Sequence, residues 1–281
     1  MGLFNFGFDN EGPGVDKNAP EKKGLFQFIE LFFRKIGKYI TLNILYMIIN
    51  IPLILGVVIS VWPHEAFLTS NGTVPPFYFT GDIVGLALMF VSLFIIGPAN
   101  TGYCYILRNF AREEHAWVFA DFFGQFKKNY KQGFLMSLVE IIVPVVLYCM
   151  FVFYGYMLPK TAGNNEMLLL IANICRIFTI FVTVFYIMMH KYIYIMIVTF
   201  DLKFKQIIKN AAILTMAKLP YNLIIFAVQA VILALAFGIN FTVGVGLSLF
   251  ILISLIYFID VFSGYSVVDK YMMSENVEKD S

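Results

Sequence analysis

Residues 97–134, GPANTGYCYILRNFAREEHAWVFADFFGQFKKNYKQGF, join two strongly apolar segments of the chain. They carry five basic residues, which are Arg108, Arg112, Lys127, Lys128 and Lys131. A basic, aromatic linker between two apolar segments is typical of a cytoplasmic hairpin that lies on a membrane. We therefore interpret the rest of the chain relative to this hairpin.

The composition indicates a membrane protein. The chain has 281 residues, of which 60% are hydrophobic and 14% are charged, whereas a soluble domain is about half apolar and about a quarter charged. The apolar residues form long runs that mark transmembrane helices. The net charge of +2 is too small to suggest nucleic-acid binding, and the three cysteines show neither a disulfide nor a metal-binding spacing.

The runs predict an all-α membrane protein with six transmembrane helices, at about 39–61, 82–107, 134–158, 167–200, 220–238 and 241–263. The fourth span has 34 residues, about 51 Å of helix against a hydrocarbon core of about 30 Å. Pro52 predicts a kink in the first span. We expect an irregular cytoplasmic N-terminal tail (1–24), one membrane domain (25–265) and a cytoplasmic C-terminal tail (266–281).

The basic residues predict the orientation. Seventeen Lys and Arg residues fall on the side of the two termini, and Lys160 alone falls in the loops on the other side. This asymmetry predicts that both termini face the cytoplasm, in a multi-pass protein of the cell membrane.

Three segments, 32–52, 122–144 and 201–220, resemble one another. Each passes through a lysine-rich amphipathic turn, becomes apolar and reaches a proline. They predict three pseudo-repeated helical hairpins, each introduced by an amphipathic cytoplasmic segment. The alternative is that any basic helix entering a membrane shows such a pattern.

Catalytic motifs are missing from the sequence. It contains no phosphate-binding loop, no H-E-x-x-H and no G-x-S-x-G motif. The histidines His64, His115 and His190 lie far apart and on different predicted sides. We therefore expect no enzyme activity, no cofactor and no metal.

Ionisable residues inside spans are costly and are often functional. Four are candidates, namely Glu140, Arg176, Lys191 and Asp260. The predicted depths of Glu140 and Arg176 disagree, so we expect no direct pair between them. Asp260 lies at the depth of Lys191 or Lys218 and is expected to form a pair there. The alternative is a proton or ion path through Glu140 and Asp260.

The second span is broken by Gly97, Pro98 and Gly102. Broken helices near a membrane centre mark transporter sites, but this break lies near the cytoplasmic end. A kink that leads into the hairpin is therefore the favoured interpretation.

The hairpin itself offers a candidate surface for docking a partner protein. Its aromatic side chains alternate with charges, and part of them anchors the helix among lipid head groups. The candidate docking residues are Arg108, Arg112, Trp117, Asp121, Phe122, Phe123 and Phe126.

The runs GPANTGYCYILRNFAREE, DFFGQFKKNYKQG and FDLKFKQIIKNA resemble the YesL-like family of bacterial integral membrane proteins. The resemblance covers nearly the whole chain. It implies a membrane protein found mainly in Firmicutes and encoded beside binding-protein-dependent sugar importers. It supplies no catalytic residues.

Two functions remain open. The first is a non-catalytic accessory subunit of a carbohydrate ABC importer, docked on its permeases or its ATPase. The second is a free-standing transporter or channel for a sugar or a related small solute, which would use Asn43, Asn50 and the ionisable residues within the spans.

Gly244, Gly246 and Ser248 predict close helix packing in the sixth span, either within the bilayer-embedded chain or in a homo-oligomer.

Overall fold

The computed structural model of the chain describes residues 24–69, 78–163 and 165–273, without the side chains of 61–69, 78, 79 and 273. These residues are almost entirely helical, and no strand occurs among them. The predicted N-terminal tail lies outside the described residues, except for Gly24. The helices in order are α1 (Leu25–Arg34), α2 (Ile36–Ile49), α3 (Ile51–Thr69), α4 (Tyr78–Leu93), α5 (Ile96–Ala111), α6 (Val118–Lys128), α7 (Tyr130–Val152), η1 (Phe153–Met157), α8 (Leu158–Ala162), α9 (Glu166–Thr199), α10 (Phe204–Ala217), α11 (Leu219–Ile239), α12 (Phe241–Leu247), η2 (Ser248–Leu252), α13 (Ile253–Val268) and η3 (Asp269–Met273), where η marks a π-helical turn.

The described residues contain four helical segments that are long and apolar enough to cross a membrane, and six when each of two bent pairs is taken as one span. The four are Tyr130–Ala162, Glu166–Thr199, Leu219–Ile239 and Phe241–Met272. The prediction of an all-α membrane protein is therefore confirmed. The last helical segment continues beyond residue 265, through the end of α13 at Val268 and η3 to Met273, and Val267 and Val268 belong to the core. Residues 274–281 of the predicted C-terminal tail lie outside the described residues.

Both bent pairs bend near a proline. Helices α2 and α3 meet at an angle of 56° around Asn50, two residues before Pro52, as expected from the lost hydrogen bond and the clash that a proline imposes on the preceding turn. Helices α4 and α5 meet at 47°, with the break at Phe94 and Ile95. The second break therefore precedes Gly97 and Pro98, which lie inside the first turn of α5, where proline is tolerated.

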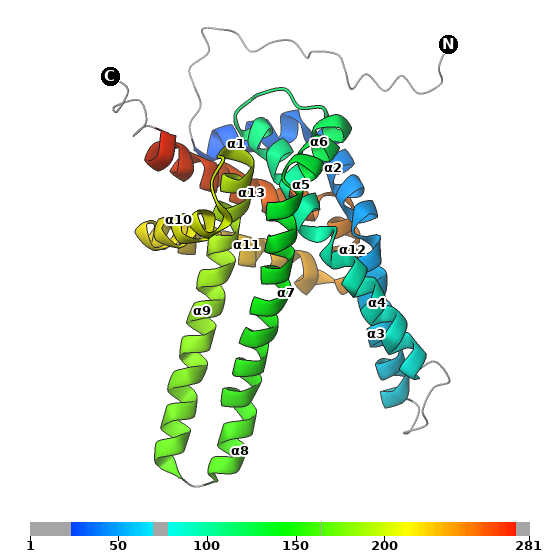
Figure 1. Cartoon of the computed structure of the whole chain (residues 1–281), viewed down its shortest axis with the longest axis vertical. Helices are drawn as coiled ribbons and strands as arrows, with labels where there is room; N and C mark the ends of the chain where they lie inside the picture. Colours follow the sequence, from blue (N-terminus) through cyan, green and yellow to red (C-terminus); the bar gives the residue numbers. More distant parts are fainter. Residues whose placement is uncertain (1–23, 70–77, 164, 274–281) are drawn as a thin grey trace.

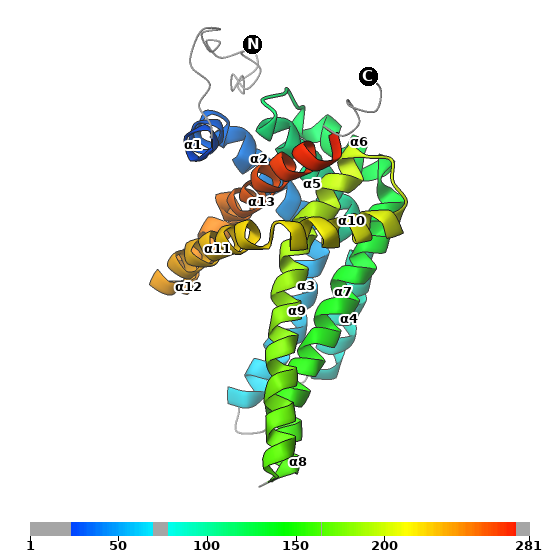
Figure 2. The same ribbon diagram turned by 90° about the vertical axis from the view of Figure 1, so that its left-hand side faces the viewer.

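Three hairpins make up the fold (Figure 1). Helices α3 and α4 form one arm, α7–α8 and α9 form a second, longer arm, and α11 packs beside α12 and α13 in the third. The helices α1, α6 and α10 lie at the end from which the two long arms extend, and α10 runs crosswise to α9 (Figures 1 and 2). The predicted pattern of three hairpins with introducing helices thus corresponds to the architecture.

A one-residue break separates each introducing helix from its hairpin. The three break residues have nearly the same backbone angles. These are φ −112° and ψ 19° at Lys35, φ −100° and ψ 18° at Asn129, and φ −117° and ψ 28° at Lys218. In each, the backbone N–H donates to the carbonyl four residues earlier. The break residues are Lys35, Asn129 and Lys218. The repeat is aligned by these breaks and not by the prolines, since Pro220 lies in the first turn of its helix whereas Pro52 and Pro144 lie far beyond their breaks.

The first break residue is also attached to the core. Lys35 Nζ lies 4.7 Å from the centroid of the Phe110 ring, and burial lowers the pKa of this amine to about 8. A lysine that is half withdrawn from water in this way fixes α1 against the end of α5.

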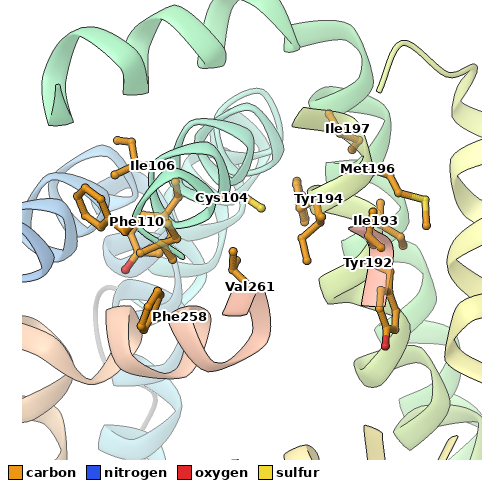
Figure 3. Packing of buried hydrophobic residues seen from close by; sticks show 14 of the residues in the cluster. Cys104, Ile106, Phe110, Tyr192, Ile193, Tyr194, Met196, Ile197, Phe258 and Val261 are labelled. Carbon is orange, nitrogen blue, oxygen red and sulfur yellow. The ribbon is translucent and has the colours of Figure 1, made fainter. Parts of the chain in front are cut away.

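The core lies where the second helices of the three hairpins, α5, α9 and α13, meet one another. Figure 3 shows side chains of α5 such as Ile106 and Phe110 near Phe258 and Val261 of α13, with residues 192–197 of α9 beside them. In contrast, the outer parts of the arms expose many large apolar side chains, as expected for surfaces that face lipid.

Glycines bring α5 very close to α6 and α7. A Cβ atom at Gly97 would overlap the carbonyl oxygen of Gly133 on α7, and a Cβ atom at Gly102 would lie 2.6 Å from the carbonyl oxygen of Phe122 on α6. Gly97 N donates a hydrogen bond of 2.7 Å to Ser137 Oγ at the same crossing. The two glycines of the predicted helix break therefore serve helix packing.

We expect Gly97→Ala to lower the free energy of unfolding by about 1–3 kcal/mol or more, because backbone atoms cannot yield to the added methyl group. Thermal unfolding of the purified protein in detergent measures the effect. The matched control is Gly246→Ala, which adds a methyl group in open space and should not lower the melting temperature. Equal melting temperatures for the two variants would contradict the role of the Gly97–Gly133 contact.

Candidate functional site

Equivalent positions of the three repeats carry polar residues into the interior. In each hairpin the residue eleven positions after the break residue is polar, and its side chain reaches the second helix of a hairpin. These residues are Tyr46 on α2, Glu140 on α7 and Gln229 on α11. The three polar groups therefore occupy the same position of the repeated unit.

Two of these groups belong to one hydrogen-bonded network, here termed the central polar cluster. Its members come from α2, α5, α7, α9 and α13, and they are Tyr46, Asn100, Glu140, His190, Tyr194 and Tyr257. Helices from all three repeats therefore meet in this cluster.

The hydrogen bonds of the cluster run toward Glu140. The hydroxyl of Tyr46 donates to Asn100 Oδ1 at 2.6 Å, and the hydroxyl of Tyr257 donates to the same atom at 3.4 Å. Asn100 Nδ2 in turn donates to the Tyr194 hydroxyl at 3.2 Å, which donates to Glu140 Oε1 at 2.7 Å. Such a chain polarises each successive donor, which strengthens the hydrogen bonds that follow it.

The two oxygens of Glu140 have very different surroundings. Oε1 accepts from Tyr194 and from Asn100 Nδ2, the latter at 3.4 Å, and lies 2.5 Å from His190 Nε2. Oε2 is buried and has no hydrogen-bond partner among the described residues. The Tyr186 hydroxyl, one turn before His190, is also buried without such a partner. Only one of the two carboxylate oxygens therefore has hydrogen-bond partners. Leaving the other one unpaired costs free energy at a buried site.

The contact between Glu140 and His190 was not predicted from the sequence. Helix α9 ends at Thr199, next to the predicted end of the fourth span at residue 200. His190 thus lies about 14 Å inside the end of its helix, and Glu140 lies about 15 Å inside the start of α7. The matching depths, measured from the helix ends, are the signal that would have found the pair.

Lys191 lies near enough to Asp260 to influence its charge, but no direct ion pair joins these two residues in the described part of the chain. Lys191 Nζ donates to Ser263 Oγ at 3.5 Å, and Gln229 Nε2 donates to the Ile256 carbonyl on α13 at 3.2 Å. The alternative partner, Lys218, instead lies over the ring of Tyr271, 4.9 Å from its centroid. This second polar group thus joins the third repeat to α9.

Arg176 lies apart from both groups. It is exposed on the outer half of α9, and its aliphatic stem runs beside Gly155 of η1. The absence of a Glu140–Arg176 pair agrees with the difference in depth.

The asparagines that suggested a solute path have structural roles. Asn43 Nδ2 donates to the carbonyls of Ser248 and Leu249 at 2.8 Å each, and Asn43 Oδ1 accepts from Ser254 N at 2.9 Å. These bonds satisfy backbone groups in and beside the π-helical turn η2. Asn50 donates to the carbonyl of Tyr46 in its own helix.

Arg108 and Phe122 were predicted to dock a partner, but their side chains are buried and offer no surface to one. The guanidinium of Arg108 donates to the Val198 carbonyl at 2.7 Å and to Thr199 Oγ1 at 3.1 Å, at the C-terminal end of α9, where a cation opposes the helix dipole. Phe122 has no exposed surface and lies beneath Gly102.

Three further candidates have partners within the chain. Arg112 forms an ion pair of 2.7 Å with Glu114. Asp121 Oδ2 accepts from Trp117 N at 2.8 Å at the start of α6, and half-buried Phe126 packs against Tyr130. These contacts hold the hairpin in shape and leave the remaining face of α6 for other partners.

The exposed face of α6 carries Trp117, Phe119 and Phe123, which are 56%, 58% and 42% exposed. Phe119, Phe123 and exposed Lys127 follow one another at four-residue intervals and so lie on one side of the helix.

The described residues contain no group of three or more His, Cys, Asp or Glu side chains placed to hold a metal ion. The central polar cluster can hold a carboxylate inside the bundle, orient an imidazole against it and connect three hairpins. It is the candidate functional site of the protein.

We expect Glu140→Leu to lower the free energy of unfolding by about 3–5 kcal/mol, because it leaves buried donors without their acceptor. Glu140→Gln retains a carbonyl oxygen and should have a smaller effect. Thermal unfolding in detergent compares the two variants, with Glu166→Gln at the exposed start of α9 as control. Equal melting temperatures for Glu140→Leu and the wild type would contradict the network.

Comparison with known proteins gave one finding. Neither the curated proteins nor the solved structures contain a match to this chain. One family model does match, and the matched residues run from α2 into α7. They include Tyr46, Asn100 and Glu140 of the central polar cluster and end before His190. The chain is thus similar, over residues 39–151, to the family described as "Protein of unknown function, DUF624".

Proposed function

We propose that the protein is a non-catalytic accessory subunit of a carbohydrate ABC importer in the cell membrane. It docks on the permeases or the ATPase through the exposed face of α6, formed by Trp117, Phe119 and Phe123. The observation that carries the proposal is this row of exposed aromatic side chains on a helix whose opposite face is fixed to α5 by Gly102 and Phe122.

Three arguments support the proposal. The resemblance to the YesL-like family implies an encoded neighbourhood of sugar importers. The distribution of basic residues predicts that α6 faces the cytoplasm, where an importer ATPase works. Aromatic side chains on a rigid helix are suited to anchor a partner, since they lose little conformational entropy on binding.

The test is a mild-detergent pull-down of the tagged full chain from cells grown on the sugar that induces the neighbouring importer genes. We expect permease and ATPase subunits in the wild-type sample and their loss in the triple variant Trp117→Ser, Phe119→Ser and Phe123→Ser. Mass spectrometry of the recovered proteins gives the readout.

The control is Phe250→Ser, which replaces an aromatic residue that is 59% exposed on the third hairpin. It should recover the same partners as the wild type. Recovery of the protein alone from induced wild-type cells, or equal recovery of importer subunits with the triple variant, would contradict the proposal.

A second function is favoured by a specific observation. The carboxylate of Glu140 and the imidazole of His190 meet inside the membrane bundle, and their side chains are 14% and 26% exposed. Paired ionisable groups within spans often belong to proton or ion pathways. A free-standing transporter or channel for a sugar or a related solute would use this pair.

In that case purified protein in lipid vesicles should take up the solute without ATP, driven by a pH gradient. Glu140→Gln should reduce uptake to the level of empty vesicles, whereas Glu166→Gln should transport like the wild type. Uptake of radiolabelled sugar provides the measurement. Equal uptake by Glu140→Gln and the wild type would remove the main residue from this mechanism.

A further inference from the structure

An apolar groove of 540 Å³ lies between α7 and α9. It is lined on α7 by Pro144, Leu147, Tyr148 and Phe151, and on α9 by Ile180, Thr183, Val184, Tyr186 and Ile187. Its volume falls within the usual range of small-molecule sites, about 300–1,000 Å³. The groove is partly open to the surface of the molecule, and its lining is almost entirely apolar.

The lining of the groove ends about one helical turn from the Glu140–His190 pair on both helices. On α7, Glu140 lies one helical turn before Pro144 and on the same face as Leu147 and Phe151, at intervals of four, seven and eleven residues. On α9, His190 lies three and seven residues after Ile187 and Thr183, which is again the spacing of one helix face. An apolar chain in the groove would therefore end beside this polar pair.

His190 has one ring nitrogen left for another partner. Nε2 lies 2.5 Å from the Glu140 carboxylate, so it carries the proton that this contact needs. Nδ1 makes no hydrogen bond to any described residue, and the imidazole side chain is 26% exposed. Nδ1 accepts a hydrogen bond when the ring is neutral and donates one when it is protonated. A hydroxyl group can satisfy Nδ1 in both states, because it both donates and accepts.

We propose that the groove between α7 and α9 binds an amphipathic alcohol from the bilayer, with its apolar chain along Leu147, Phe151 and Val184 and its hydroxyl at His190. Glu140 is the positioning residue that orients the imidazole. Its negative charge selects against an anionic head group such as a carboxylate. This site is independent of the proposed docking on an importer.

The test uses the full chain in lipid nanodiscs and three photoreactive probes with the same dodecyl chain, which end in a hydroxyl, a methyl or a carboxylate group. Labelled peptides are identified by mass spectrometry. We expect the hydroxyl probe to label residues 144–151 and 180–187 about fivefold more than the methyl probe, which is the effect of one hydrogen bond. Unlabelled dodecanol should compete, and the carboxylate probe should label least.

His190→Phe should reduce labelling by the hydroxyl probe to that of the methyl probe, whereas His115→Phe, on the exposed hairpin, should change neither. Val184→Trp fills the groove and should therefore reduce labelling by all three probes. This second variant tests the groove even if His190→Phe does not fold. Equal labelling by the hydroxyl and methyl probes in the wild type would mean that the groove holds lipid chains only. That result, or unchanged labelling in folded His190→Phe, overturns the proposal.

Discussion

The close approach of α5 to α7 at Gly97 and Gly133 is the constraint on which the rest of the structure depends. It places α5 so deeply that nearly every residue from Gly97 to Phe110 is buried. α5 thereby becomes the common neighbour of α6, α7, α9 and α13. Between helices in a membrane the hydrophobic effect supplies little attraction, so close packing and hydrogen bonds hold such a centre together. The hydrogen bond from Gly97 N to Ser137 Oγ and the chain through Asn100 belong to this one crossing.

The repeats share a register as well as a shape. Each introducing helix ends in the same kind of break, and each first helix carries a polar residue at the same distance beyond it. The three residues have nevertheless acquired different partners, since Tyr46 and Glu140 join the central polar cluster whereas Gln229 donates to the Ile256 carbonyl on α13. The repeats therefore share their helices and differ chemically at this one position of the repeated unit.

Much of the fold could be predicted from the sequence, because membrane spans follow from apolar runs whose minimum length is fixed by the bilayer. The kink near Pro52, the 34-residue fourth span and the three hairpins follow from local signals of this kind. The site was less predictable. The Glu140–His190 contact depends on which faces of α7 and α9 are turned toward each other, and the burial of Arg108 depends on the position of a helix end about ninety residues later in the chain. A basic residue in a hairpin gives no local sign of whether it faces solvent or caps a distant helix.

The repeated unit, one introducing helix followed by one hairpin, has a consequence for how such a chain can evolve. A unit that starts and finishes on one face of the membrane can be duplicated or lost as a whole without inverting any neighbouring segment. Three units give an even number of crossings, and α1 and η3 accordingly lie at the same end of the molecule (Figure 1). Ancestral chains of one or two units would have been topologically complete, and specialisation of a single polar position per unit could then follow gene duplication.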